Sequence, residues 1–100
     1  MTGELVVLAS PGDVLELMDH PRGGVIALTR EAGATFLAPV HADLAGLICL
    51  TGTSESHLAI VSREFEVPAA MAVVFPGGQP EPGSLVVLDC SGDAAVVRTP

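Results

Sequence analysis

The stretch from Leu50 to Glu64, which reads LTGTSESHLAIVSRE, predicts the end of a buried strand, a loop of small residues and then a helix. The apolar run Gly46 to Leu50 is short and bounded by turn-forming residues, as expected of a strand covered on both faces. Thr53 or Ser54 can cap the helix by accepting a hydrogen bond from a free backbone N–H. His57 then falls in the first helical turn.

His57 is thus expected where a helix presents unpaired backbone amides. The first N–H groups of a helix have no intrahelical acceptor, and the helix dipole is positive at that end. Such an end suits an anion, and phosphate is the usual one. A neutral imidazole keeps a ring-nitrogen lone pair, which a nucleophile needs. The local sequence therefore permits a phosphohistidine at this position.

The segment Gly52 to Ala70 resembles the phosphohistidine signature of the PEP-utilising enzymes. That family includes pyruvate phosphate dikinase, PEP synthase, enzyme I of the sugar phosphotransferase system and rifampin phosphotransferase. Its signature reads roughly Gly-Gly-x-Thr-Ser/Cys-His-Ala-Ala-Ile-x-Ala-Arg-Glu-x-Gly-Ile-Pro-Ala-Val. The matching positions in this chain are Gly52, Ser56, His57, Ala59, Ile60, Arg63, Glu64, Pro68 and Ala69. By this resemblance, His57 is the residue that accepts the phosphoryl group.

The chain departs from the signature at four positions. Thr53 replaces the second glycine, Glu55 replaces threonine, Leu58 replaces a small alanine, and Glu66 replaces the glycine that would end the helix. Glu55 matters most, because a carboxylate two residues before the histidine would repel a phosphoryl dianion. These departures support an alternative interpretation, in which the fold serves as an interaction or regulatory module without phosphoryl transfer.

The composition indicates one small domain spanning residues 1–100. Apolar residues make up 49% of the chain and aromatics 3%, so the core is expected to consist of Val, Leu, Ala and Ile. The net charge of −8 argues against nucleic acid and anionic membranes as partners. The sequence shows neither a basic-then-apolar leader nor an apolar run of the roughly 20 residues that span a bilayer. We therefore expect a cytoplasmic protein, in which Cys49 and Cys90 are reduced, buried thiols.

Strands alternate with short helices along the chain, which predicts a layered α/β domain with a mixed sheet. A first helix is expected to begin after the cap Ser10, bury Val14, Leu15, Leu17 and Met18, and end at His20. A helical turn is expected at 41–45. The expected strands cover residues 4–9, 25–29, 34–40, 46–50, 69–75, 85–88 and 94–98. The resemblance implies that this pattern is the swivelling β/β/α domain of the PEP-utilising enzymes.

Other polar residues are weaker candidates for a site. His20 is expected to be a solvated turn residue. His41 and Asp43 fall on different helix faces, which argues against a second chemical pair. Asp89 and Asp93 are typical turn aspartates, and the scattered histidines lack metal-ligand spacing, so we predict no metal site. Arg63 is expected to form a structural salt bridge or interdomain contact, because it lies on another helix face from His57.

The resemblance implies a phosphoryl carrier that is not catalytically complete alone. His57 would be phosphorylated, while Thr53, Ser54, Ser56 and the first-turn amides would bind the phosphoryl oxygens. The domain would bind no cofactor itself, and PEP or ATP would act as donor through partner domains. One partner would be an ATP-binding domain or a separate protein, and the other would be a barrel that binds PEP or pyruvate. Neither fits within 100 residues.

Overall fold

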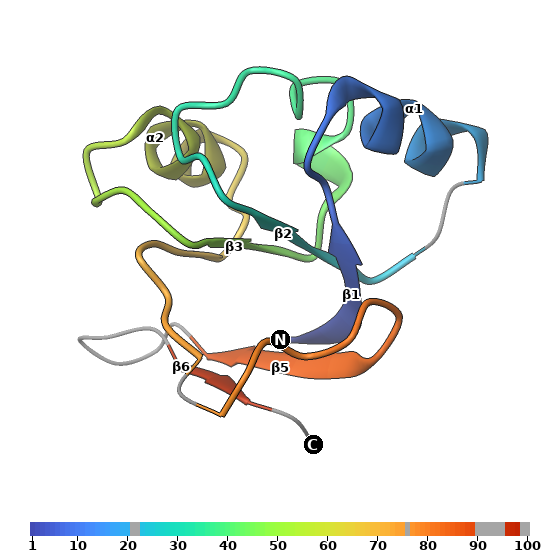
Figure 1. Cartoon of the computed structure of the whole chain (residues 1–100). Coiled ribbons are helices and arrows are strands. Elements are labelled where there is room, and N and C mark those ends of the chain that lie inside the picture. Colours follow the sequence, from blue (N-terminus) through green and yellow to red (C-terminus); the bar gives the residue numbers. More distant parts are fainter. Residues whose placement is uncertain (21–22, 76, 90–95, 99–100) are drawn as a thin grey trace.

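The computed structural model describes residues 1–20, 23–75, 77–89 and 96–98, and within these ranges it forms a six-stranded mixed sheet with two short helices (Figure 1). The strand order is β4-β3-β2-β1-β5-β6. Neighbouring strands from β1 to β4 run parallel, whereas β5 pairs antiparallel with both β1 and β6. The elements are β1 Thr2–Val7, α1 Pro11–Asp19, β2 Val25–Thr29, the 3-10 helix η1 His41–Asp43, β3 Gly46–Cys49, α2 His57–Glu64, β4 Ala69–Ala70, β5 Leu85–Asp89 and β6 Val96–Arg98.

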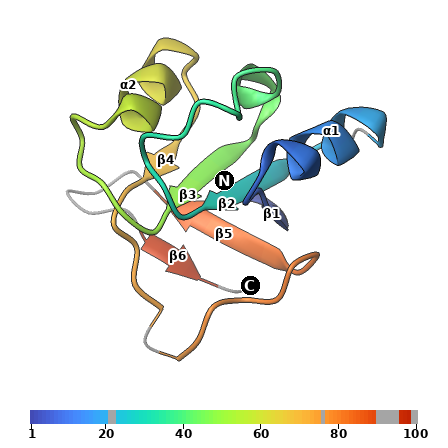
Figure 2. The ribbon, with the colours of Figure 1, turned by 45° about the horizontal axis from the view of Figure 1, so that its top comes forward.

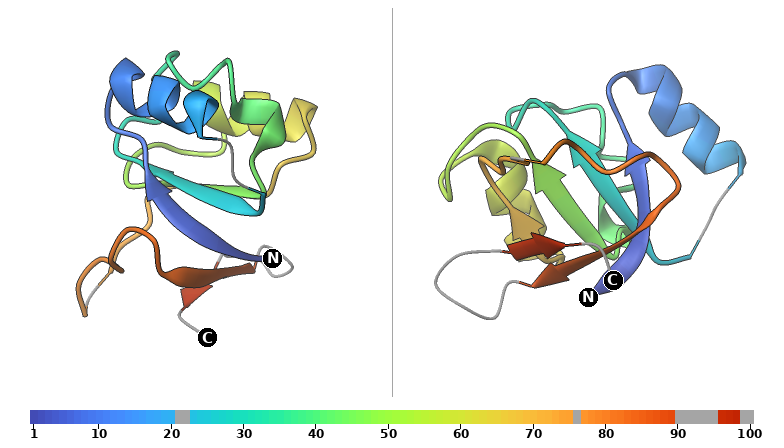
Figure 3. Two further views of the ribbon diagram at one scale, coloured as in Figure 1. Left: turned by 90° about the vertical axis from the view of Figure 1, so that its right-hand side faces the viewer. Right: turned by 60° about the horizontal axis from the view of Figure 1, so that its bottom comes forward.

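Two apolar clusters, one on each face of the sheet, explain why β2 and β3 are buried throughout. Both helices cover one face, and the sheet curls so that β5 and β6 lie beneath its other face (Figures 1 and 3). Val25 and Leu47 pack on the helix side, while Ile26 and Ile48 pack against β5. Alternating side chains along each strand point to opposite faces, so a strand covered on both faces is apolar at every position. The predicted layered α/β fold is confirmed.

Helix α1 begins as predicted but buries a narrower stripe. The Ser10 hydroxyl accepts a hydrogen bond from the Asp13 backbone N–H, and the helix starts at Pro11. Val14 is buried, whereas Leu15 is 61% exposed and Met18 is 48% exposed. The prediction of a wider buried stripe was wrong. Val14 and Leu17, three residues apart, face the core, whereas Leu15 and Met18 lie on the neighbouring face of the helix, which the sheet does not cover. Figure 2 shows α1 lying along one side of the helical layer.

Two predicted strands are shorter or absent. Residues 34–40 form successive turns, in which the amide of Val40 donates to the carbonyl of Leu37 instead of to a neighbouring strand. Strand β4 contains only Ala69 and Ala70, because Ala72 adopts a left-handed conformation with φ of 54° that ends the extended run. The closing strand β6 is Val96–Arg98, and the predicted turn before it lies largely outside the described residues.

The structure also bears on the predicted helical turn, the two cysteines and the membrane-spanning segments. The helical turn predicted at 41–45 is the 3-10 helix η1. Cys49 is a buried free thiol, as expected, while Cys90 lies outside the described residues. Burial raises the pKa of Cys49 to about 12. Within the described ranges, neither helix is long and apolar enough to cross a membrane.

Candidate functional site

His57 is the first residue of α2, and its side chain is exposed. The predicted position at a helix entrance is therefore confirmed. The predicted cap was wrong: the N-cap residue is Ser56, with φ of −70° and ψ of 155°, and not Thr53 or Ser54. Ser56 makes no side-chain capping bond, because its hydroxyl is engaged in the preceding loop.

The hydroxyl groups before α2 stabilise a compact turn. The Oγ of Ser56 accepts a hydrogen bond of 2.8 Å from the Thr53 amide, and the Oγ1 of Thr53 accepts one of 3.1 Å from the Glu55 amide. The Ser56 amide closes the turn by donating to the Thr53 carbonyl at 3.0 Å. Thr53, Ser54 and Ser56 thus lie together immediately before His57. Each hydroxyl that accepts one bond keeps its own O–H as a donor.

Only some of the backbone amides in the first turn of α2 are available to bind an anion. The Leu58 amide donates to the carbonyl of Ala32 at 2.9 Å, so it is already engaged. The amides of His57 and Ala59 have no hydrogen-bond partner in the part of the chain that the structure describes. Two donors, not the complete first turn expected from the sequence, therefore remain at the positive end of the helix dipole.

Gly52 sets the direction of the loop that leads to His57. Its φ of +96° lies in the region that favours glycine, and an added Cβ would collide with the Cβ of Ala32 and the Oγ of Ser56. The neighbouring Thr51 hydroxyl donates to the Arg30 carbonyl at 2.7 Å and accepts from the Ala32 amide at 3.3 Å. The loop after β2 and the loop after β3 therefore hold each other in place.

The structure explains two of the four departures from the signature. Leu58 is 1% exposed and packs in the core on the helix side, away from the surface that carries His57. Glu66 has φ of 58°, so it adopts at the end of α2 the left-handed conformation that glycine favours. Glu55 is exposed in the loop before the helix, where its charge remains relevant to a bound anion.

Arg63, in the last turn of α2, contacts the same loop. Its Nη1 donates to the Ser54 carbonyl at 2.8 Å. The structure shows this hydrogen bond to the backbone, and the interdomain contact predicted for Arg63 stays a prediction. Arg63 therefore holds the loop that carries the candidate phosphate-binding hydroxyls.

His41 is the residue near the site that sequence reasoning missed. It is 1% exposed, and its Nε2 lies 2.7 Å from the Oγ of Ser62 on α2. Burial, followed by the charge of His57, lowers the pKa of His41. Asp43, its partner in the rejected pair, is exposed. No spacing in the sequence links residues 41 and 62, because the contact depends on how α2 packs over η1.

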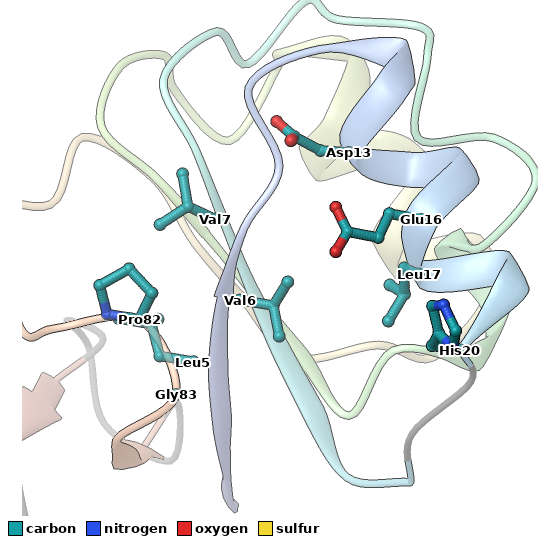
Figure 4. A pocket seen from close by; sticks show the side chains of 9 residues that line it. All are labelled: Leu5, Val6, Val7, Asp13, Glu16, Leu17, His20, Pro82 and Gly83. Carbon is teal, nitrogen blue, oxygen red and sulfur yellow. The ribbon is translucent and has the colours of Figure 1, made fainter.

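A second set of ionisable groups lines a hollow of about 420 Å³ between α1 and β1 (Figure 4). Asp13, Glu16 and His20 come from α1, and Val6 lies opposite on β1. His20 is the exposed C-cap of α1, as predicted for a solvated residue. Among the described residues, no group of three or more His, Cys, Asp or Glu side chains is placed to hold a metal ion. Asp93 lies outside the described residues.

Comparison with known proteins identifies a family for most of the chain. The model of the PEP-utilising enzyme, mobile domain, matches residues 21–92. This span runs from the residues before β2 to those after β5 and includes the Gly52 loop, His57 and all of α2. A search of curated proteins finds no match.

Proposed function

Because the chain belongs to the mobile-domain family of PEP-utilising enzymes, we propose that it carries a phosphoryl group on His57 and passes it between partner active sites. The family is a domain of multidomain enzymes, which implies partner domains. The observation that carries the proposal is the exposed imidazole at the first position of α2, beside two amides without partners among the described residues.

The proposed step is nucleophilic displacement at phosphorus. A ring-nitrogen lone pair of His57 attacks the phosphoryl group of PEP or ATP, which the partner domains hold. The new N–P bond forms as the P–O bond to the leaving group breaks, and that oxygen keeps the electron pair as enolpyruvate or ADP. At the second site the acceptor's oxygen attacks phosphorus, the N–P bond breaks and the imidazole regains its lone pair. The domain itself needs no bound cofactor for either step.

The loop before α2 supplies the groups proposed to bind the phosphoryl oxygens. Thr53, Ser54 and Ser56 offer hydroxyl donors, and the amides of His57 and Ala59 offer backbone donors at the positive end of the helix. Hydrogen bonds from neutral and backbone donors to an anion are stronger than those between neutral groups. The loop is already ordered by its internal hydrogen bonds, so little conformational entropy is lost when a phosphoryl group binds.

The alternative function is an interaction or regulatory module without phosphoryl transfer. Glu55 is the observation that favours it, because an exposed carboxylate in the same turn opposes a second negative charge. Leu58 no longer supports this alternative, since it serves the core. The alternative predicts that His57→Ala leaves partner binding and biological activity unchanged, whereas the carrier loses activity.

Chemical phosphorylation of the folded chain tests the proposed site. Phosphoramidate is a small phosphoryl donor that modifies accessible imidazoles, and His20 provides an exposed histidine within the same molecule. We expect acid-labile, alkali-stable phosphate to form on His57 faster than on His20, as measured by phosphorus NMR and peptide mapping. His57→Gln and His20→Gln assign the signals. Equal rates at the two histidines would show that the helix entrance does not favour a phosphoryl group.

A further inference from the structure

The buried imidazole of His41 forms a polar link between η1 and α2. Its Nε2 lies 2.7 Å from the Oγ of Ser62, and its ring packs against Phe65 with ring centroids 5.7 Å apart. An apolar side chain could fill the same space without the cost of removing a polar ring from water. Its placement under the helix that carries His57 suggests a role beyond packing.

The link fixes the helix in rotation. Ser62 and Leu58 are one turn apart on the buried face of α2. The hydrogen bond between His41 and Ser62 holds this face, while the Ala32 carbonyl holds the amide of Leu58. Because both contacts hold the helix that begins at His57, we expect loss of the contact at Ser62 to loosen the position of His57.

We propose that His41 is a positioning residue for His57, and that protonation of His41 and phosphorylation of His57 are coupled across α2. The coupling to phosphorylation rests on the proposed carrier function. The electrostatic coupling between the two histidines does not rest on it, and it can be measured in the unmodified chain.

The charges around His41 identify His57 as its electrostatic partner. Burial and then the charge of His57 lower the pKa of His41. Cys49, in the core on the helix side, is uncharged near neutral pH because burial raises its pKa to about 12. The remaining ionisable side chains of η1 and α2 are exposed: Asp43, Arg63 and Glu64.

Phosphorylation reverses the sign of this interaction. A protonated His57 repels a proton on His41, whereas a phosphoryl group on His57 carries negative charge and attracts one. Thermodynamic linkage makes the effect reciprocal: if phosphorylation favours protonated His41, protonated His41 favours phosphorylation to the same extent. A charged His41 has donors on both ring nitrogens, so it can keep its contact with the Ser62 oxygen.

Histidine NMR titration of the full chain tests the electrostatic half. We expect His57→Gln to raise the proton affinity of His41 by about two- to fivefold, because a nearby positive charge is removed. Phosphorylation of His57 with phosphoramidate, carried out in the His20→Gln variant so that His20 cannot react, is expected to raise it further. An unchanged His41 titration in His57→Gln overturns the coupling. If His57→Gln shifts His41 but His57 does not accept phosphate, the electrostatic coupling stands and the carrier function fails.

Substitutions at the contact test the positioning half. His41→Gln keeps a hydrogen-bonding group but does not titrate, so we expect phosphorylation by phosphoramidate near the wild-type rate and without the pH dependence due to His41. Ser62→Ala is expected to slow phosphorylation of His57 about tenfold, with His20 unaffected, and Ser62→Thr restores the hydroxyl. If His41→Gln keeps the wild-type pH profile, the coupling between His41 protonation and phosphorylation fails. If folded Ser62→Ala reacts at the wild-type rate, His41 has no positioning role.

Discussion

The end of α2 provides a sharp test of the structural account, through the substitution Glu66→Gly. The amide of Glu66 donates to the Arg63 carbonyl at 3.2 Å, and the Val67 amide donates to the Ser62 carbonyl at 2.8 Å. This pair of bonds forms a Schellman motif, which requires a left-handed residue between the helix and Val67. Glu66 occupies that position with φ of 58°, although glycine adopts it at lower cost.

The expected gain is the difference between two opposing terms. A left-handed conformation costs a residue with a Cβ about 1–2 kcal/mol. Glycine recovers that cost but loses about 0.5–1 kcal/mol more conformational entropy on folding. The Glu66 side chain is exposed, so little packing is lost on its removal. The two ranges differ by roughly 0–1.5 kcal/mol, so Glu66→Gly is expected to raise the free energy of unfolding by about 0.75 kcal/mol at their midpoints, or Tm by about 3–6 °C for a domain of this size.

Urea denaturation followed by circular dichroism measures the change, and Glu64→Gly is the matched control. Glu64 is also exposed and carries the same charge, but it is the last residue of α2 and has no positive φ, so its replacement by glycine should cost roughly 0.5–1 kcal/mol. The two variants have the same net charge and composition, and they are expected to change stability in opposite directions. A loss of stability in Glu66→Gly equal to that in Glu64→Gly would refute the left-handed cap.

Three further predictions concern the loop and the two histidines. Gly52→Ala should destabilise the fold by roughly 2–4 kcal/mol in urea, and Gly78→Ala, with similar positive φ but open space, should cost less; equal costs would contradict the collision inferred at Gly52. Glu55→Gln should speed phosphorylation of His57 by phosphoramidate about two- to fivefold at low salt, and the gain should shrink as salt is raised; a rate independent of both charge and salt would dismiss Glu55 as an obstacle. The free energy of unfolding should fall as pH decreases through and below the ordinary pKa of 6.5, because the lowered pKa of His41 makes the unfolded chain bind more protons there. His41→Gln should flatten this part of the pH profile, and an identical slope in both proteins would assign it to other groups.

The sequence predicted the helix entrance because the signals there are local. The apolar strand, the small-residue loop and His57 all belong to one continuous stretch. The cap was assigned to Thr53 or Ser54 because both are good capping residues. The choice of Ser56 depends on loop hydrogen bonds and on the close contact between Gly52 and the loop after β2.

The errors in the fold share a physical cause, which is packing between segments far apart in the chain. The predicted buried face of α1 was too wide because the helix has apolar residues on two adjoining faces, and the sheet covers only one of these faces. Residues 34–40 contain apolar side chains suited to a strand, yet they form turns that bury Leu37 and Val40 in the core on the helix side of the sheet. The contact of His41 with Ser62 has the same origin, since two segments meet only once α2 lies over η1.

Phosphoryl transfer from the biological donor onto His57 is the most direct test of the carrier function. The full chain is incubated with radiolabelled PEP or ATP and with the PEP-binding and ATP-binding partner domains, and acid-labile label is quantified per chain. The account predicts stoichiometric label on His57 that is lost in His57→Gln and discharged when the acceptor of the second site is added. Absence of label on His57, with partner domains that phosphorylate another member of the family, would contradict it.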